Sequence, residues 1–130
     1  MTPEVARVLV DNHLQRLMIF SIVMLLWGLI AWRRNPEGPK FGFATMTAAW
    51  SSINLLIVLV SGNDRGLPNL AALNSFLVLN LWLNVVYIVV GAAVGLRTKD
   101  RAQGAGWAVV VQGVALLVLD GLLYGQLMAK

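Results

Sequence analysis

Asp120 is the residue whose chemistry most needs an explanation, because it lies inside a long apolar stretch of the sequence. An ionised carboxylate deep in a bilayer costs on the order of 2.5–3.5 kcal/mol, so Asp120 must be neutral, hydrated or paired. Arg16 is the only basic residue that we place at a matching depth. The sequence therefore predicts an Arg16–Asp120 ion pair between the first and the last apolar stretch.

A stripe of polar residues and glycines in the third apolar stretch is expected to face the same site. Asn80, Asn84, Tyr87, Gly91 and Gly95 recur at i, i+4, i+7, i+11 and i+15, which places them on one face of a helix. Such a stripe is typical of the surface by which a membrane helix packs against other helices, because its polar groups need partners. We predict that Asn80 and Asn84, together with Asn54, complete the hydrogen bonds of the Asp120 carboxylate.

Each of the four apolar stretches places a polar group at a similar height, if a helix rises by about 1.5 Å per residue. This height lies in the half of the bilayer farther from the first and third loops. The residues predicted to form the polar layer or to bind a ligand there are Asn12, His13, Arg16, Trp50, Asn54, Asn80, Asn84, Tyr87, Gln112, Asp120 and Tyr124.

The sequence leaves three interpretations of this layer open. The layer can be structural, since polar side chains of membrane helices contribute about 0.6 to 2 kcal/mol per hydrogen bond and fix the register of the helices. It can also bind a small polar or amphipathic ligand. The alternative is a proton-coupled or ion-conducting transporter centred on Asp120. The polar track toward the cytoplasmic face of the membrane is thin, since it consists only of Gln112, Thr45, Thr47 and Tyr87.

No catalytic constellation is recognisable, which favours a non-enzymatic protein and leaves the question of an enzyme open. There is no glycine-rich phosphate loop, no Ser–His–acid set and no pair of carboxylates. The absence of cysteine excludes thiolate chemistry. His13 is the only histidine, so we expect no metal site and no cofactor, with haem or quinone binding at the rim near His13 as a remote alternative.

The composition predicts an all-α membrane protein. The chain has 130 residues, of which 58% are hydrophobic and 12% charged, whereas about a quarter of the residues of a soluble domain are charged. We expect a single membrane domain over residues 1–130, with a helix over 2–13 that is interfacial or extends the first span. The spans are predicted at about 14–32, 41–61, 70–96 and 105–128. Short connections between them predict an antiparallel, up-down-up-down four-helix bundle.

The distribution of charge predicts the topology. The first and third loops hold most of the basic residues, namely Arg33, Arg34, Lys40, Arg97, Lys99 and Arg101. By the positive-inside rule, these loops face the cytoplasm and both termini lie outside the bacterial cytoplasmic membrane. The net charge of +4 is thus explained by the topology. The sequence has no basic face interleaved with aromatic residues, so we expect no nucleic-acid binding.

Two pairs of glycines permit close helix packing. Gly91 and Gly95 form one pair, and Gly121 and Gly125 form the other, each with three residues between them. We expect these pairs to serve mainly in packing within the bundle. A homodimer through either pair is the less favoured use, and the lipid bilayer is the partner that the composition requires.

The last three spans resemble a known family. The resemblance is carried by Trp50-x-x-x-Asn54-Leu55, by residues 79–88 with Trp82, by Gly106-Trp107, by Val111-Gln112-Gly113 and by residues 116–120 ending in Asp120; residues 12–16 are a weaker match. These segments are similar to a family of small bacterial four-helix membrane proteins of unknown function.

The resemblance implies the four-helix fold and supplies no activity. In the family pattern an acid usually stands at the position of Asn84, so the neutral residue here leaves Asp120 as the only buried carboxylate. The small multidrug transporters are similar in size, but they use a glutamate in the first span, which this sequence lacks there.

Overall fold

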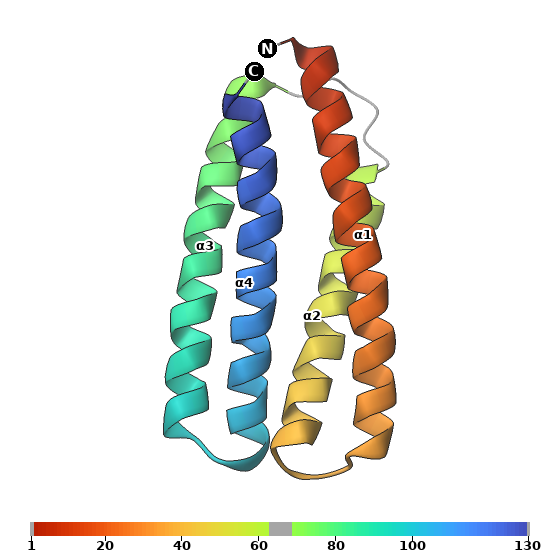
Figure 1. The fold of residues 1–130 in the computed structure, drawn as a ribbon, viewed down its shortest axis with the longest axis vertical. Helices are drawn as coiled ribbons and strands as arrows, with labels where there is room; N and C mark the ends of the chain where they lie inside the picture. Colours follow the sequence, from red (N-terminus) through yellow and green to blue (C-terminus); the bar gives the residue numbers. More distant parts are fainter. Residues whose placement is uncertain (1, 63–68, 130) are drawn as a thin grey trace.

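Four α-helices make up nearly all of the computed structural model, which describes residues 2–62 and 69–129 (Figure 1). The helices are α1 (Pro3–Arg34), α2 (Gly38–Gly62), α3 (Leu70–Arg97) and α4 (Asp100–Met128), and the described residues contain no strand. All four are long and apolar enough to cross a membrane. The all-α, four-helix prediction is confirmed.

The first helix is continuous from its N-terminus to the first loop. The Thr2 hydroxyl accepts a hydrogen bond from the Val5 backbone N–H at 3.3 Å. In the first turn, Pro3 has no N–H that would need a partner, and the acidic Glu4 is favourable near the free N–H groups. Most of the segment predicted over residues 2–13 is therefore continuous with the first predicted span, as one helix.

Two short connections place α1–α2 and α3–α4 as antiparallel hairpins. Gly38 begins α2 with a φ of +78°, and Asp100 begins α4 with a φ of +59°, so each connection turns through left-handed backbone. Both connections lie at one end of the bundle, which we call the loop end. Both chain termini lie at the opposite end, which we call the terminal end (Figure 1).

The packing order differs from the order along the chain. The helix α4 packs against α3 on one side and against α2 on the other, and it also touches α1, which packs against α2. Because α2 and α4 both start at the loop end, these direct neighbours run parallel (Figure 1). The central helix of the bundle is therefore α4, the helix that carries Asp120.

Glycines set the closest approaches between helices. A Cβ on Gly42 would overlap the backbone of Arg101, and a Cβ on Gly104 would overlap the carbonyl of Pro39, so α2 and α4 are in backbone contact near the loop end. A Cβ on Gly91 would lie 2.6 Å from the Gly106 carbonyl oxygen.

The two glycine pairs have different surroundings. Gly91 and Gly95 are buried against α4, and a Cβ on Gly95 would lie 2.7 Å from the Trp107 ring. This pair therefore packs within the bundle. Gly121 has only Leu81 near it, at 3.9 Å, and Gly125 has nothing within 4 Å. A homodimer through Gly121 and Gly125 stays a prediction.

The apolar interior is small, and most large apolar side chains point outward. Leu17, Val58 and Leu116 form a buried cluster contributed by α1, α2 and α4. By contrast Trp82 is 67% exposed and Leu96 is 74% exposed. An outer surface this apolar is expected when lipid, and not water, surrounds the helices.

Candidate functional site

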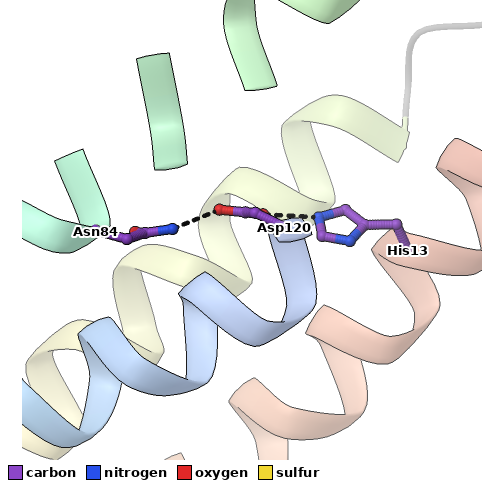
Figure 2. Close-up of polar contacts among 3 residues, drawn as sticks. All are labelled: His13, Asn84 and Asp120. Atoms are coloured by element: carbon purple, nitrogen blue, oxygen red, sulfur yellow. Dashed lines mark hydrogen bonds and ion pairs between the residues drawn. The ribbon is translucent and has the colours of Figure 1, made fainter. Parts of the chain in front are cut away.

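The carboxylate of Asp120 joins three helices (Figure 2). The Asn84 side-chain amide of α3 donates a hydrogen bond to Asp120 Oδ2, with Nδ2 and Oδ2 2.8 Å apart. On the opposite side, His13 Nε2 of α1 lies 3.2 Å from Asp120 Oδ1. A hydrogen bond across this contact needs a proton either on Nε2 or on the carboxyl group. We call these three residues the Asp120 site.

Close packing of α3 on α4 brings Asn84 to the carboxylate. Leu77, Asn84 and Gly91 recur every seven residues and are all buried on the face of α3 that meets α4. Opposite this face, a Cβ on Gly113 would lie 3.2 Å from the Asn84 carbonyl oxygen. The glycines therefore let the two backbones approach until the short Asn84 side chain reaches Asp120.

His13 lies on the inward face of α1. The buried residues of this helix are Ala6, His13, Leu17, Ser21 and Gly28, a spacing that follows one helix face. A Cβ on Gly28 would lie 3.0 Å from the Ala48 backbone nitrogen, so α1 is held closely against α2. The His13 side chain is only 9% exposed, so it is buried between the helices.

The predicted Arg16–Asp120 ion pair is wrong. Among the described residues the partner of Asp120 on α1 is His13, and Arg16 Nη1 is buried without a hydrogen-bond partner. The reason is helical phase: Leu17 points inward, and Arg16 is rotated from it by about 100°. Arg16 lies at a depth similar to that of Asp120, but His13 lies on the inward face of α1 and therefore makes the contact.

The other predicted asparagines do not reach the carboxylate. Asn54 is buried in α2, but its Nδ2 has no hydrogen-bond partner. Asn80 is partly buried on α3 and forms no hydrogen bond to Asp120, although it lies one turn from Asn84. Of the three asparagines, only Asn84 takes the role that the sequence assigned to them.

The remaining candidate residues are spread around the bundle. The rings of Trp50 and Tyr87 contact each other across α2 and α3, with centroids 5.0 Å apart. Gln112 is buried in α4, and both polar atoms of its side chain lack a partner. Asn12 is exposed and Tyr124 is half-buried. The Asp120 site thus includes only part of the predicted layer.

The chemistry available at the site is acid–base and hydrogen-bonding chemistry. A carboxylate next to an imidazole can share a proton or bind a group that brings one. Within residues 2–62 and 69–129, no cluster of three or more His, Cys, Asp or Glu side chains could hold a metal ion. Haem or quinone binding at His13 stays a prediction, and a ligand at Nε2 would have to displace Asp120.

The fold and this site define a small multi-pass membrane protein with four apolar helices and a carboxylate held between three of them. The chain belongs to a family of unknown function, DUF6992, which it matches over residues 16–121. This segment contains Asn84 and Asp120, whereas His13 precedes it. No curated protein and no solved structure shows a significant match to the chain. The expected family of unknown function is confirmed, and it assigns no activity.

Proposed function

We propose that this protein binds a small polar or amphipathic ligand at the Asp120 site, within the bacterial cytoplasmic membrane. The observation that carries the proposal is a carboxylate that two other helices hold in the interior of an apolar bundle. A structural hydrogen bond needs no charged group, and an acid in a membrane helix is a costly choice that usually marks a functional position.

Unpartnered polar atoms on α1 support a binding role. Within residues 2–62 and 69–129, His13 Nδ1 and Arg16 Nη1 are both buried and have no hydrogen-bond partner. These residues are three apart on α1, so they lie near each other on the helix surface. A ligand with an anionic or carbonyl oxygen would pair with the Arg16 guanidinium, while a donor group on the same ligand would suit His13 Nδ1 or Asp120.

Native mass spectrometry of the protein released from detergent tests the proposal. We expect the wild type to retain a small molecule that Asp120→Asn and Arg16→Gln lose. Ser52→Ala, on an exposed position of α2, should retain it. Equal retention by all variants, or no bound molecule in any of them, would leave the polar cluster with a purely structural role.

A second candidate function is proton-coupled transport or ion conduction centred on Asp120. The specific observation in its favour is that Thr47, Ser51 and Gln112 are buried and continue the polar interior toward the loop end. Proteoliposomes that contain a pH-sensitive dye test this candidate. A transporter gives a proton flux that Asp120→Asn abolishes, whereas a ligand-binding protein gives no flux above that of empty liposomes.

The proposed topology places the loop end in the cytoplasm and both termini outside. In support, the basic residues of the two short connections gather at one end of the bundle (Figure 1). At the terminal end, Arg7 and Arg16 are the basic residues of α1 that run against this rule.

A further inference from the structure

We propose that Leu17, Val58 and Leu116 divide the polar interior of the bundle into two compartments, and that the compartment nearer the loop end binds water. We call these three side chains the apolar layer. The compartment on the terminal side is the Asp120 site. The inner compartment is lined by Thr47, Ser51, Asn54 and Gln112. The inference does not depend on ligand binding at Asp120.

The residues of the inner compartment are fully buried. Thr47 and Ser51 are 0% exposed, Gln112 is 1% exposed and Asn54 is 3% exposed. The three residues of α2 recur at i, i+4 and i+7 and so share one face of the helix. Ala44 and Val58 continue this buried face toward the loop end and the terminal end.

These side chains lack partners among residues 2–62 and 69–129. Thr47 Oγ1, Ser51 Oγ, Asn54 Nδ2 and both polar atoms of Gln112 are buried and form no hydrogen bond. A buried polar group without a partner costs roughly 1–3 kcal/mol, and proteins commonly meet this need with bound water. Four such side chains therefore point to a bound group that supplies both donors and acceptors.

Two other serines satisfy their hydroxyls within their own helices. The Ser52 hydroxyl, on the exposed side of α2, donates to the Ala48 carbonyl of its own helix at 2.8 Å. Ser21 likewise donates to the Leu17 carbonyl at 2.7 Å. A hydroxyl in an apolar environment normally satisfies itself in this way. The Ser51 and Thr47 hydroxyls do not, and are free to bind water.

Helix register places Gln112 opposite the α2 residues. Gly104 packs against Pro39 and Phe43, and α2 and α4 run parallel. Gln112 lies eight residues beyond Gly104, which is about 12 Å along the helix. A distance of 12 Å along α2, measured from the middle of the Pro39–Phe43 segment, reaches a point between Thr47 and Ser51. Gln112 therefore lies level with Thr47 and Ser51, and Asn54 lies about one turn farther toward the terminal end, close to the level of Leu116.

The apolar layer separates this compartment from the Asp120 site. On α4, Gln112, Leu116 and Asp120 are spaced at i, i+4 and i+8 on one face, with the leucine between the two polar residues. On the antiparallel α1, Leu17 stands in the same way between His13 and Ser21. Val58 of α2 completes the contact with the two leucines. A ring of apolar side chains of this kind can block water and ions by dewetting.

On the loop side of the inner compartment, Ala44 is 0% exposed, and α2 and α4 are in backbone contact at Gly42 and Gly104. We place the barrier to water from the terminal end at the apolar layer.

Water-edited solid-state NMR of the protein in lipid bilayers tests the hydration. Magnetisation should pass from water to the Gln112 side-chain amide, assigned through its loss in Gln112→Leu. The exposed Gln15 is the positive control. A Gln112 amide that receives no water magnetisation would show that the compartment is dry and overturn this part of the inference.

Reaction of single cysteines with Ag⁺ in lipid nanodiscs tests the apolar layer, since the chain has no cysteine of its own. We expect Ser51→Cys to react slowly, and at least about tenfold faster when Leu116→Ala is added, because a thiol must be wet to ionise and react. Ser52→Cys, which faces outward, should stay slow in both backgrounds.

Val58→Ala is the second opening variant, in case Leu116→Ala does not fold. Fast reaction of Ser51→Cys with the layer intact would show that the layer is no barrier. An unchanged slow rate in both opening variants would show that these side chains do not control access. Either result overturns the division into two compartments.

Discussion

The imidazole of His13 and the carboxylate of Asp120 meet across α1 and α4, with Nε2 and Oδ1 3.2 Å apart. The two residues come from opposite ends of the sequence, and each lies on the inward face of its helix. Their contact, together with that of Asn84, ties three helices to one acidic group (Figure 2).

Double-mutant cycles should show that Asp120 is coupled to His13 and not to Arg16. We expect a coupling free energy of about 1 kcal/mol between His13→Ala and Asp120→Ala, because the pair is buried and in contact. The cycle with Arg16→Gln should give a clearly smaller value. Unfolding free energies in mixed micelles provide the measurement, and a larger coupling to Arg16 would contradict the observed pairing.

Asn84→Ala is expected to lower the unfolding free energy by about 0.6–1.7 kcal/mol, since it removes a hydrogen bond between membrane helices. The matched control is Asn80→Ala, which removes the same side chain one turn away, where it does not contact Asp120. Unfolding in mixed micelles again reports the difference. Equal costs for the two variants would mean that the Asn84–Asp120 bond contributes nothing measurable.

Gly104→Ala and Gly125→Ala should have opposite effects on stability. A methyl group at Gly104 collides with the Pro39 carbonyl, and overpacking of this kind costs about 1–3 kcal/mol. Gly125 has open space around it, and an alanine there gains up to about 1 kcal/mol from its higher helix propensity. Thermal unfolding in detergent compares the two. A tolerated Gly104→Ala would argue against backbone contact between α2 and α4.

Cysteine labelling in intact cells tests the topology. Thr2→Cys should react with a membrane-impermeant maleimide, whereas Lys99→Cys should react only after the membrane is permeabilised. Both positions are exposed and lie at opposite ends of the bundle, so each is the control for the other. Labelling of Lys99→Cys alone in intact cells would invert the proposed orientation.

Much of the fold could be predicted from the sequence, because membrane spans are determined by length and apolarity. The connections that contain Gly38 and Lys99 could also be predicted, because each of them interrupts the apolar sequence with charged residues. The lateral arrangement was not, since short connections define which helices are antiparallel but not that α2 lies directly against α4. The positions that determine this contact are Gly42 and Gly104. The presence of a glycine in the sequence does not show which helix packs against it.

The candidate site was predicted in part, and the errors have a common cause. Depth along a helix can be counted from its ends, and it correctly indicated that Asn84 and Asp120 lie at similar levels. Depth does not determine the direction in which a side chain points, so it cannot distinguish His13 from Arg16 as the partner of Asp120. The spacing of Ala6, His13, Leu17, Ser21 and Gly28 contained the missing signal, because these residues share one helix face.

The contact between His13 and Asp120 can be measured directly in lipid bilayers. His13 is the only histidine, so ¹⁵N-histidine labels a single ring, and ¹³C-aspartate labels the carboxylate carbons of the four aspartates, Asp120 among them. Rotational-echo double-resonance NMR should detect a short-range coupling between Nε2 and the Asp120 carbon, as the 3.2 Å contact requires, and Asp120→Asn should abolish it. A coupling that is absent from the wild type, or that persists unchanged in Asp120→Asn, would contradict the assignment of Asp120 to a site shared by three helices.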